Sequence, residues 1–119
     1  MDSSNGSHTV REHFVNHAPQ VKATYDEILR AAKKFGPVKE EAKKTSIHLV
    51  RKTAFAGVAT RKTALILTLK SDTDVADKRI ARREQASAHR WHLEIKLEGP
   101  EQVDQELLAW IGKAYDLAS

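Results

Sequence analysis

The sequence predicts an α+β domain, in which an antiparallel sheet of four to five strands packs one face against an N-terminal and a C-terminal helix. Near both ends of the chain, apolar residues recur at three- and four-residue spacing, the pattern of amphipathic helices. Between them, short runs alternate apolar and polar residues, which is typical of strands with one buried face. Because helices and strands do not alternate along the chain, an α+β arrangement is favoured over a parallel α/β sheet.

Length and composition are those of one domain with its own core. The chain has 119 residues, of which 40% are apolar. We expect a disordered tail over residues 1–8, where the sequence is small and polar, and a single domain over residues 9–119. The absence of cysteine excludes disulfides and thiolate chemistry and favours a cytoplasmic location. No apolar run approaches the roughly 18 residues of a membrane helix, so we expect no membrane partner.

Two helical segments are predicted in the N-terminal part. Residues 9–17 predict a short helical arm with Val10 and Phe14 on one side. Residues 19–35 predict an amphipathic helix that ends at Gly36 and Pro37, because proline cannot continue a helix.

Five segments in the middle of the chain have strand character: residues 38–42, 46–52, 54–60, 64–70 and 90–97. The last is the clearest, since apolar residues from Trp91 to Leu97 alternate with Arg90, His92, Glu94 and Lys96. Residues 72–88 carry many charges and little apolar periodicity. They predict either an exposed loop or a short peripheral helix around residues 75–80.

The final helix is predicted to start at Gly99-Pro100-Glu101. Proline suits the first helical turn, and the acidic residues Glu101 and Asp104 suit its positive end. Its apolar stripe consists of Val103, Leu107, Trp110, Ile111, Ala114 and Leu117 or Ala118.

Positive charge is concentrated in the strand region. Residues 38–97 contain fourteen basic and seven acidic residues, a net charge of +7, whereas the rest of the chain carries −3. A segregated field of this kind favours anionic ligands. Basic pairs recur at predicted turns and strand ends, and the candidate phosphate-binding residues are Lys43, Lys44, Arg51, Lys52, Arg61, Lys62, Arg82, Arg83 and Arg90. The same charges also suit a second interpretation, in which they keep the uncovered sheet face and its edges soluble.

Aromatic residues make up only 6% of the chain, and Trp91 alternates with core residues. Phosphate or duplex binding is therefore favoured over base stacking, which needs exposed rings.

Catalytic patterns have little support. Glu94 and Lys96 have the E-x-K spacing of magnesium-dependent nucleases, for which Asp72 or Asp74 would have to supply a further carboxylate. E-x-K is also common on solvent-facing strands, where opposite charges are good neighbours. There is no Gly-x-Ser-x-Gly elbow and no glycine-rich phosphate loop. We assign no catalytic residue and expect no cofactor.

Histidine spacing permits a metal site but does not require one. His13 and His17 are four residues apart on the predicted arm, with His8 upstream as a third ligand. The glutamate of the metalloprotease pattern is absent between them, and closed metal sites need three or four convergent ligands. We therefore expect no metal.

Several motifs together resemble a bacterial family of domains of unknown function. They are Tyr25-Asp26-x-Ile28-Leu29, Gly36-Pro37, Lys43-Lys44-Thr45-Ser46, Phe55-Ala56-Gly57-Val58, residues 65–69, Val103-Asp104-x-Glu106-Leu107-x-x-Trp110 and Ala114-Tyr115-Asp116. The resemblance covers about residues 12–117. It implies a compact helix–sheet–helix domain that stands alone or follows nuclease-like or transport-like modules, and it implies no catalytic residues.

The sequence therefore supports three hypotheses. The first is a small non-enzymatic module whose basic sheet side binds an anion, most plausibly a nucleic-acid backbone. The second is a protein-interaction or homodimerisation module that uses an exposed strand edge or the His13 arm. The third is magnesium-dependent phosphodiester cleavage through Glu94 and Lys96.

Overall fold

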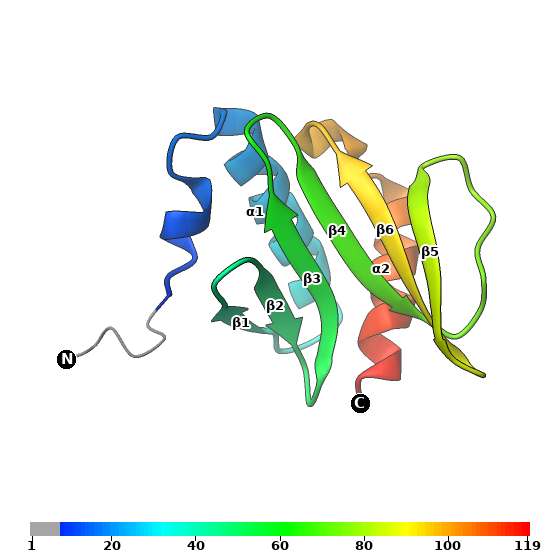
Figure 1. Ribbon diagram of the computed structural model, residues 1–119. Coiled ribbons are helices and arrows are strands. Elements are labelled where there is room, and N and C mark those ends of the chain that lie inside the picture. Colours follow the sequence, from blue (N-terminus) through cyan, green and yellow to red (C-terminus); the bar gives the residue numbers. More distant parts are fainter. Residues whose placement is uncertain (1–7) are drawn as a thin grey trace.

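The computed structural model describes residues 8–119 and contains two α-helices, two short 3-10 helices and six strands (Figure 1). The tail predicted for residues 1–8 lies outside the described residues, apart from His8. None of the helices in the described part of the chain is long and apolar enough to cross a membrane. In chain order the elements are η1 (Arg11–Phe14), α1 (Pro19–Lys33), β1 (Lys39–Ala42), β2 (Ile47–Val50), β3 (Ala54–Thr60), β4 (Leu65–Ser71), β5 (Ile80–Ser87), β6 (Arg90–Leu97), η2 (Pro100–Gln102) and α2 (Gln105–Leu117).

The strands form one antiparallel sheet in the order β1-β2-β3-β4-β6-β5. The α+β class and the antiparallel sheet are confirmed, but the prediction of four to five strands is wrong because β5 makes a sixth. Its residues were expected to form a loop or a short helix. Only Ile80 of β5 is partly buried, and the other seven residues are exposed. A strand exposed on both faces needs no apolar alternation, since backbone pairing with β6 is enough to hold it.

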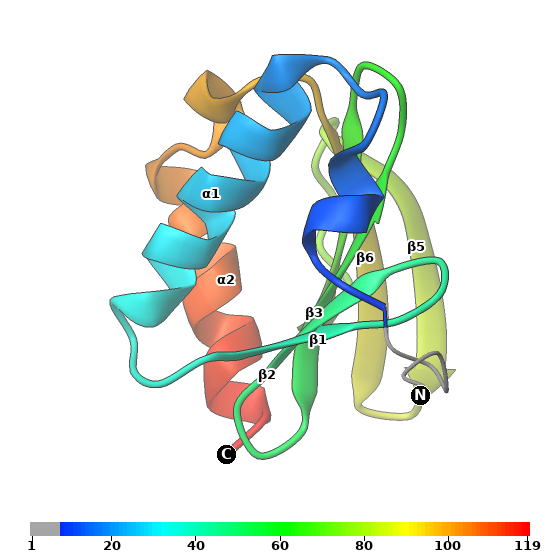
Figure 2. The same ribbon diagram turned by 90° about the vertical axis from the view of Figure 1, so that its left-hand side faces the viewer.

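Both α-helices lie on the same side of the sheet, and the other side is uncovered (Figure 2). The buried face follows strict alternation in β4, where Leu65, Leu67 and Leu69 are almost completely buried. Val21, Tyr25 and Ile28 of α1 and Leu107, Ile111 and Ala114 of α2 belong to the same core cluster. The core therefore sits between the helices and the sheet, and one sheet face remains accessible.

The connection from α1 to β1 is fixed by two tyrosines. Tyr25 is buried on α1 and its hydroxyl donates to Glu40 Oε1 of β1 at 2.5 Å. The hydroxyl of Tyr115 donates to the Pro37 carbonyl at 3.0 Å. It also passes so close to Gly36, which has φ 151°, that a side chain there would collide with it. α1 ends at Lys33, slightly before the predicted boundary, because the backbone N–H groups of Lys34 and Phe35 donate to carbonyls three residues back, in a tighter final turn.

The start of the last helix differs from the prediction. Pro100 begins the 3-10 turn η2, and α2 begins only at Gln105. Asp104 caps α2, because its Oδ1 accepts from the Leu107 backbone N–H at 3.0 Å. The sequence contains two helix-start signals four residues apart, and the carboxylate cap determines where the α-helix begins.

The predicted N-terminal arm is reduced to the short helix η1, and it packs against the domain. The Phe14 and Tyr25 rings are 5.3 Å apart. His13 is buried, its Nε2 lies 2.8 Å from the Lys43 carbonyl oxygen, and its own carbonyl accepts from Thr60 Oγ1. The arm is thus part of the folded domain, and the His13 side chain is not free to bind a partner.

Candidate ligand-binding face of the sheet

The uncovered side of the sheet is called the open face below. Its members follow from the strand register, in which Thr68 pairs with both Gly57 and Glu94, and Gly57 pairs with His48. Strand register and alternation place the following strand residues on the open face: Lys39, Glu41, His48, Val50, Ala54, Gly57, Ala59, Ile66, Thr68, Lys70, Arg82, Glu84, Ser87, Arg90, His92, Glu94 and Lys96.

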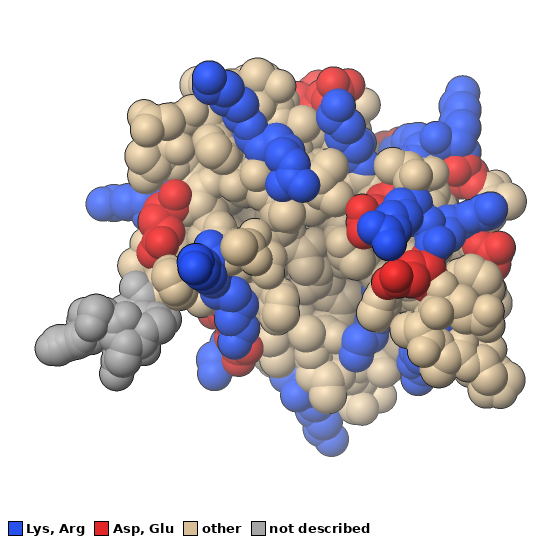
Figure 3. Space-filling view, viewed as in Figure 1, with Lys and Arg blue, Asp and Glu red and all other residues tan. Residues whose placement is uncertain are grey.

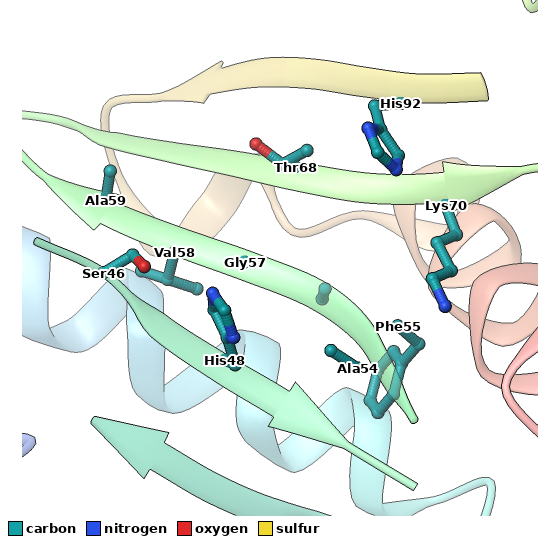
Figure 4. A pocket seen from close by; sticks show the side chains of 11 residues that line it. Ser46, His48, Ala54, Phe55, Gly57, Val58, Ala59, Thr68, Lys70 and His92 are labelled. Carbon is teal, nitrogen blue, oxygen red and sulfur yellow. The ribbon is translucent and has the colours of Figure 1, made fainter. Parts of the chain in front are cut away.

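A shallow groove of about 380 Å³ runs over β2, β3 and β4 on this side. Small residues form its floor, because β3 contributes Gly57, Ala59 and neighbouring alanines. His48 and His92 project beside it from β2 and β6, and Lys70 projects from β4 (Figure 4). The lining residues are Ser46, His48, Ala54, Phe55, Ala56, Gly57, Val58, Ala59, Thr68, Lys70 and His92. The groove thus combines an apolar floor with polar and cationic groups at its margins.

Basic side chains surround a largely uncharged centre on this face (Figure 3). Five basic and three acidic residues lie on the open face. Towards the two edges the cations are paired: Lys39 lies 3.5 Å from Glu41, and Arg82 lies 3.4 Å from Glu84. Over the inner strands β4 and β6, Lys70, Lys96 and Arg90 have no carboxylate partner among residues 8–119. The cations without a carboxylate partner therefore lie over the inner strands, and one of them, Lys70, lines the groove.

The comparisons with known proteins place this domain in a family. The model of the family described as Domain of unknown function (DUF5655) matches residues 10–118, which is nearly the whole chain. The chain belongs to this family. The comparisons with curated proteins and with solved structures found no match.

The candidate residues predicted from sequence do not gather into one patch of the DUF5655 domain. Lys43 and Lys44 follow β1, and Arg61 and Lys62 follow β3, so antiparallel pairing brings these two turns to the same end of the sheet. Arg51 and Lys52 follow β2 at the opposite end.

Four of the candidate phosphate-binding residues contact other side chains of the DUF5655 domain. Lys43 lies 3.5 Å from Glu41, and Arg82 is paired with Glu84. Arg83 lies 3.3 Å from Asp74 and is paired in register with Leu93 of the buried face, so it points away from its neighbour Arg82. Arg51 packs on Tyr115, as described in the Discussion.

The remaining five candidates, Lys44, Lys52, Arg61, Lys62 and Arg90, have no ion-pair partner within residues 8–119. The guanidinium groups of Arg61 and Arg90 each donate to the carbonyl of the preceding residue. These five are available to a ligand, but only Arg90 belongs to a strand of the open face.

The carboxylates of the nuclease hypothesis are not brought together. Glu94 pairs with Thr68 in the middle of the sheet, whereas Asp72 follows the end of β4, four residues further on. At about 3.4 Å per residue this separation exceeds 10 Å. Asp74 is held by Arg83. In the part of the chain that the structure describes, no group of three or more His, Asp or Glu side chains could hold a metal ion.

The three histidines whose spacing would permit a metal site also do not converge. His13 Nε2 is hydrogen-bonded to the Lys43 carbonyl, and His8 Nδ1 lies 3.2 Å from Glu12 Oε2. The bond from the Thr9 backbone N–H, followed by that from His8, lowers the pKa of Glu12 below its ordinary value. This N-terminal cluster therefore stabilises the first turn, and its side chains are not arranged as metal ligands.

Proposed function

We propose that this DUF5655 domain is a non-enzymatic binding module whose open face binds the phosphate backbone of a nucleic acid. The observation that carries the proposal is the position of Lys70, Lys96 and Arg90. These cations lack carboxylate partners in the described chain and lie on the inner strands β4 and β6, where Lys70 lines the groove and Lys96 and Arg90 lie on the same face of β6. Phosphate contacts of this kind give affinity without sequence preference.

Protection of sheet edges explains the cations of the edge strands but not these. Edge strands commonly carry charges that discourage pairing with a second sheet. Arg82 and Arg83 on β5 fit that role, since β5 is an edge strand and both side chains are held by carboxylates. Lys70 and Lys96 lie on strands that are already paired on both sides, so edge protection gives no reason for their charge.

Glu94 is the one feature of the inner strands that opposes an anionic ligand. It lies on the open face between His92 and Lys96 and carries the only negative charge of β4 and β6 on this face. Its effect is to reduce the affinity for phosphate without removing the surplus of positive charge. Replacement of Glu94 by an uncharged residue should therefore strengthen binding.

The proposal is tested by fluorescence anisotropy of labelled single- and double-stranded DNA and RNA across a salt series, first with magnesium and then with a chelator. We expect the affinity to fall steeply with salt, and each phosphate contact contributes about 0.7 to 0.9 to the slope of log K against log salt. Lys70→Gln with Lys96→Gln should lower both the affinity and the slope. The matched control is Lys33→Gln with Lys34→Gln, which removes the same charge at the end of α1. Equal losses in the two double variants would exclude the open face as the site.

A second candidate function is homodimerisation through β5. The observation in its favour is an eight-residue edge strand that is exposed along almost its whole length. Such an edge offers unpaired backbone groups to a second strand. Light scattering over a concentration series tests this candidate: a rise to twice the monomer mass supports it, and a constant monomer mass contradicts it.

A further inference from the structure

Gly57 occupies a position where the fold itself has no need of glycine. It lies in the middle of β3, an inner strand of the sheet, where glycine weakens a strand because it has no side chain to pack. Gly36 is the only glycine of residues 8–119 with positive φ, so the backbone of Gly57 suits any residue. A Cβ at this position would meet nothing closer than 4.0 Å, the distance to His48 Cδ2 and to Thr68 Cβ. Packing therefore leaves room for a side chain that the sequence does not supply.

We propose that Gly57 forms the floor of a subsite for a planar ring, and that the ring is an unpaired base of single-stranded nucleic acid. This inference rests on the proposed function and specifies its ligand class. A strand glycine without a structural role often marks the place where a ligand approaches the backbone closely.

The groups around Gly57 suit a nucleotide. The floor has no side chain at Gly57 and only small ones at the alanines beside it, so a base can approach the backbone of β3, and the imidazoles of His48 and His92 flank that surface (Figure 4). Lys70 is on the same face, and its Nζ reaches across to Thr53 Oγ1 at 3.4 Å, so it spans the end of the groove where a phosphate would lie. The ring and the phosphate would thus be held by different groups of the same groove.

The geometry also selects single strands over duplexes. In a duplex the bases are stacked and paired, and only their edges are exposed in the grooves. A base can reach the floor at Gly57 only when it is unpaired. The low aromatic content favoured phosphate contacts over stacking, but a count of Phe, Trp and Tyr does not include the two imidazoles that the strands bring to this face.

The test compares wild type with Gly57→Val, which fills the groove at its floor. Valine suits a strand, so the variant should unfold at or above the wild-type temperature. The probes are a labelled single-stranded oligonucleotide, a duplex of the same length and heparin, which carries negative charge but no bases. We expect affinity for the single strand to fall about tenfold, in line with the loss of one stacked base, while affinity for duplex and heparin is unchanged. Gly57→Ala should give a smaller loss.

The control is Ala86→Val, which adds similar bulk at an exposed position of β5, outside the groove. It should leave all three affinities unchanged. An undiminished single-strand affinity in Gly57→Val would overturn the ring subsite, and so would an equal loss for all three probes. Wild-type binding to duplex and heparin would in either case preserve the proposed function. Absence of binding of wild type to every probe at low salt would overturn both.

Discussion

The guanidinium of Arg51 lies over the ring of Tyr115, with its central carbon 4.3 Å from the ring centroid, and donates from Nη1 to the Tyr115 carbonyl at 3.1 Å. The same ring packs edge-on against Phe55, and the Tyr115 hydroxyl donates a hydrogen bond to the Pro37 carbonyl. Arg51 thus connects the β2–β3 turn to the end of α2. The residue belongs to a basic pair that suggested phosphate binding, but its side chain holds two layers of the fold together.

Replacement of Arg51 should therefore lower stability more than it lowers ligand affinity. We expect Arg51→Met to reduce the free energy of unfolding by an amount on the order of 1–2 kcal/mol, because it loses a cation–π contact and a hydrogen bond. Urea denaturation measures the change. Lys52→Met, which removes the same charge from the adjacent residue, should leave stability nearly unchanged. Equal stability of the two variants would show that the Arg51 contact contributes nothing.

The hydrogen bond between Tyr25 and Glu40 makes a second prediction. Tyr25→Phe should lower the free energy of unfolding by about 1 kcal/mol, because it removes the hydrogen bond that the hydroxyl donates, while the exposed Glu40 carboxylate left without this donor can turn to water. Glu40→Gln keeps an acceptor in place and should cost less. A Tyr25→Phe variant as stable as wild type would contradict the account.

The same hydroxyl should make stability fall in alkaline solution. Burial, and then the hydrogen bond to the Glu40 carboxylate, raises the pKa of Tyr25 above its ordinary value. The folded chain therefore keeps this proton at a pH where the unfolded chain loses it. The contribution of Tyr25 is complete below about pH 10 and is lost as pH rises further. Denaturation from pH 8 to pH 11 should show the stability difference between wild type and Tyr25→Phe shrinking above pH 10, and a constant difference would contradict this.

The Asp104 cap of α2 predicts that the stability of the domain falls in acidic solution. The Leu107 N–H bond and the nearby Arg79 guanidinium lower the pKa of Asp104. Its contribution is therefore present above the ordinary aspartate pKa of about 3.9 and is lost as pH falls below it. At neutral pH, Asp104→Ala should cost about 1 kcal/mol, whereas Asp104→Ser keeps a capping oxygen and should cost less. Urea denaturation at pH 7 and pH 3 measures both, and a difference between wild type and Asp104→Ala that is as large at pH 3 as at pH 7 would argue against a charge-dependent cap.

Much of the fold follows from local patterns in the sequence. The alternation in residues 64–70 and 90–97 predicted β4 and β6 almost to the residue, because each turns one largely apolar face toward the core. β5 could not be found in this way. Its partner supplies backbone pairing only, and neither of its faces is buried, so it leaves no periodic signal in the sequence.

The candidate site was less predictable, because neighbours in sequence point to opposite faces of a strand. The pair Arg82-Arg83 shows this directly: Arg82 pairs with Glu94 of the open face and Arg83 with Leu93 of the buried face. Single cations at alternate positions, such as Lys70 and Lys96, form the open face instead. They form no pair in the sequence, and only the strand register shows that they lie on one surface.

Glu94 separates the binding proposal from the nuclease hypothesis. Glu94→Gln should increase affinity for a labelled DNA strand severalfold, because it removes the only negative charge that the inner strands place on the open face. Anisotropy at fixed salt measures the gain, and Glu98→Gln, beyond the end of β6, is the matched control. A metal-dependent nuclease would instead show cleavage that needs magnesium and disappears in Glu94→Gln. Weaker binding without cleavage would contradict both.

The most direct test of the central claim is a map of the ligand-binding surface by amide NMR shifts during titration with a short single-stranded oligonucleotide. We predict that the largest shifts occur at Gly57, Thr68, Lys70 and His92, with smaller ones at the adjacent turn of residues 61–64. The amides of α1 and α2 should remain nearly unchanged, since the helices lie on the other side of the sheet. Shifts concentrated on the helices, or no shifts at low salt, would contradict the account.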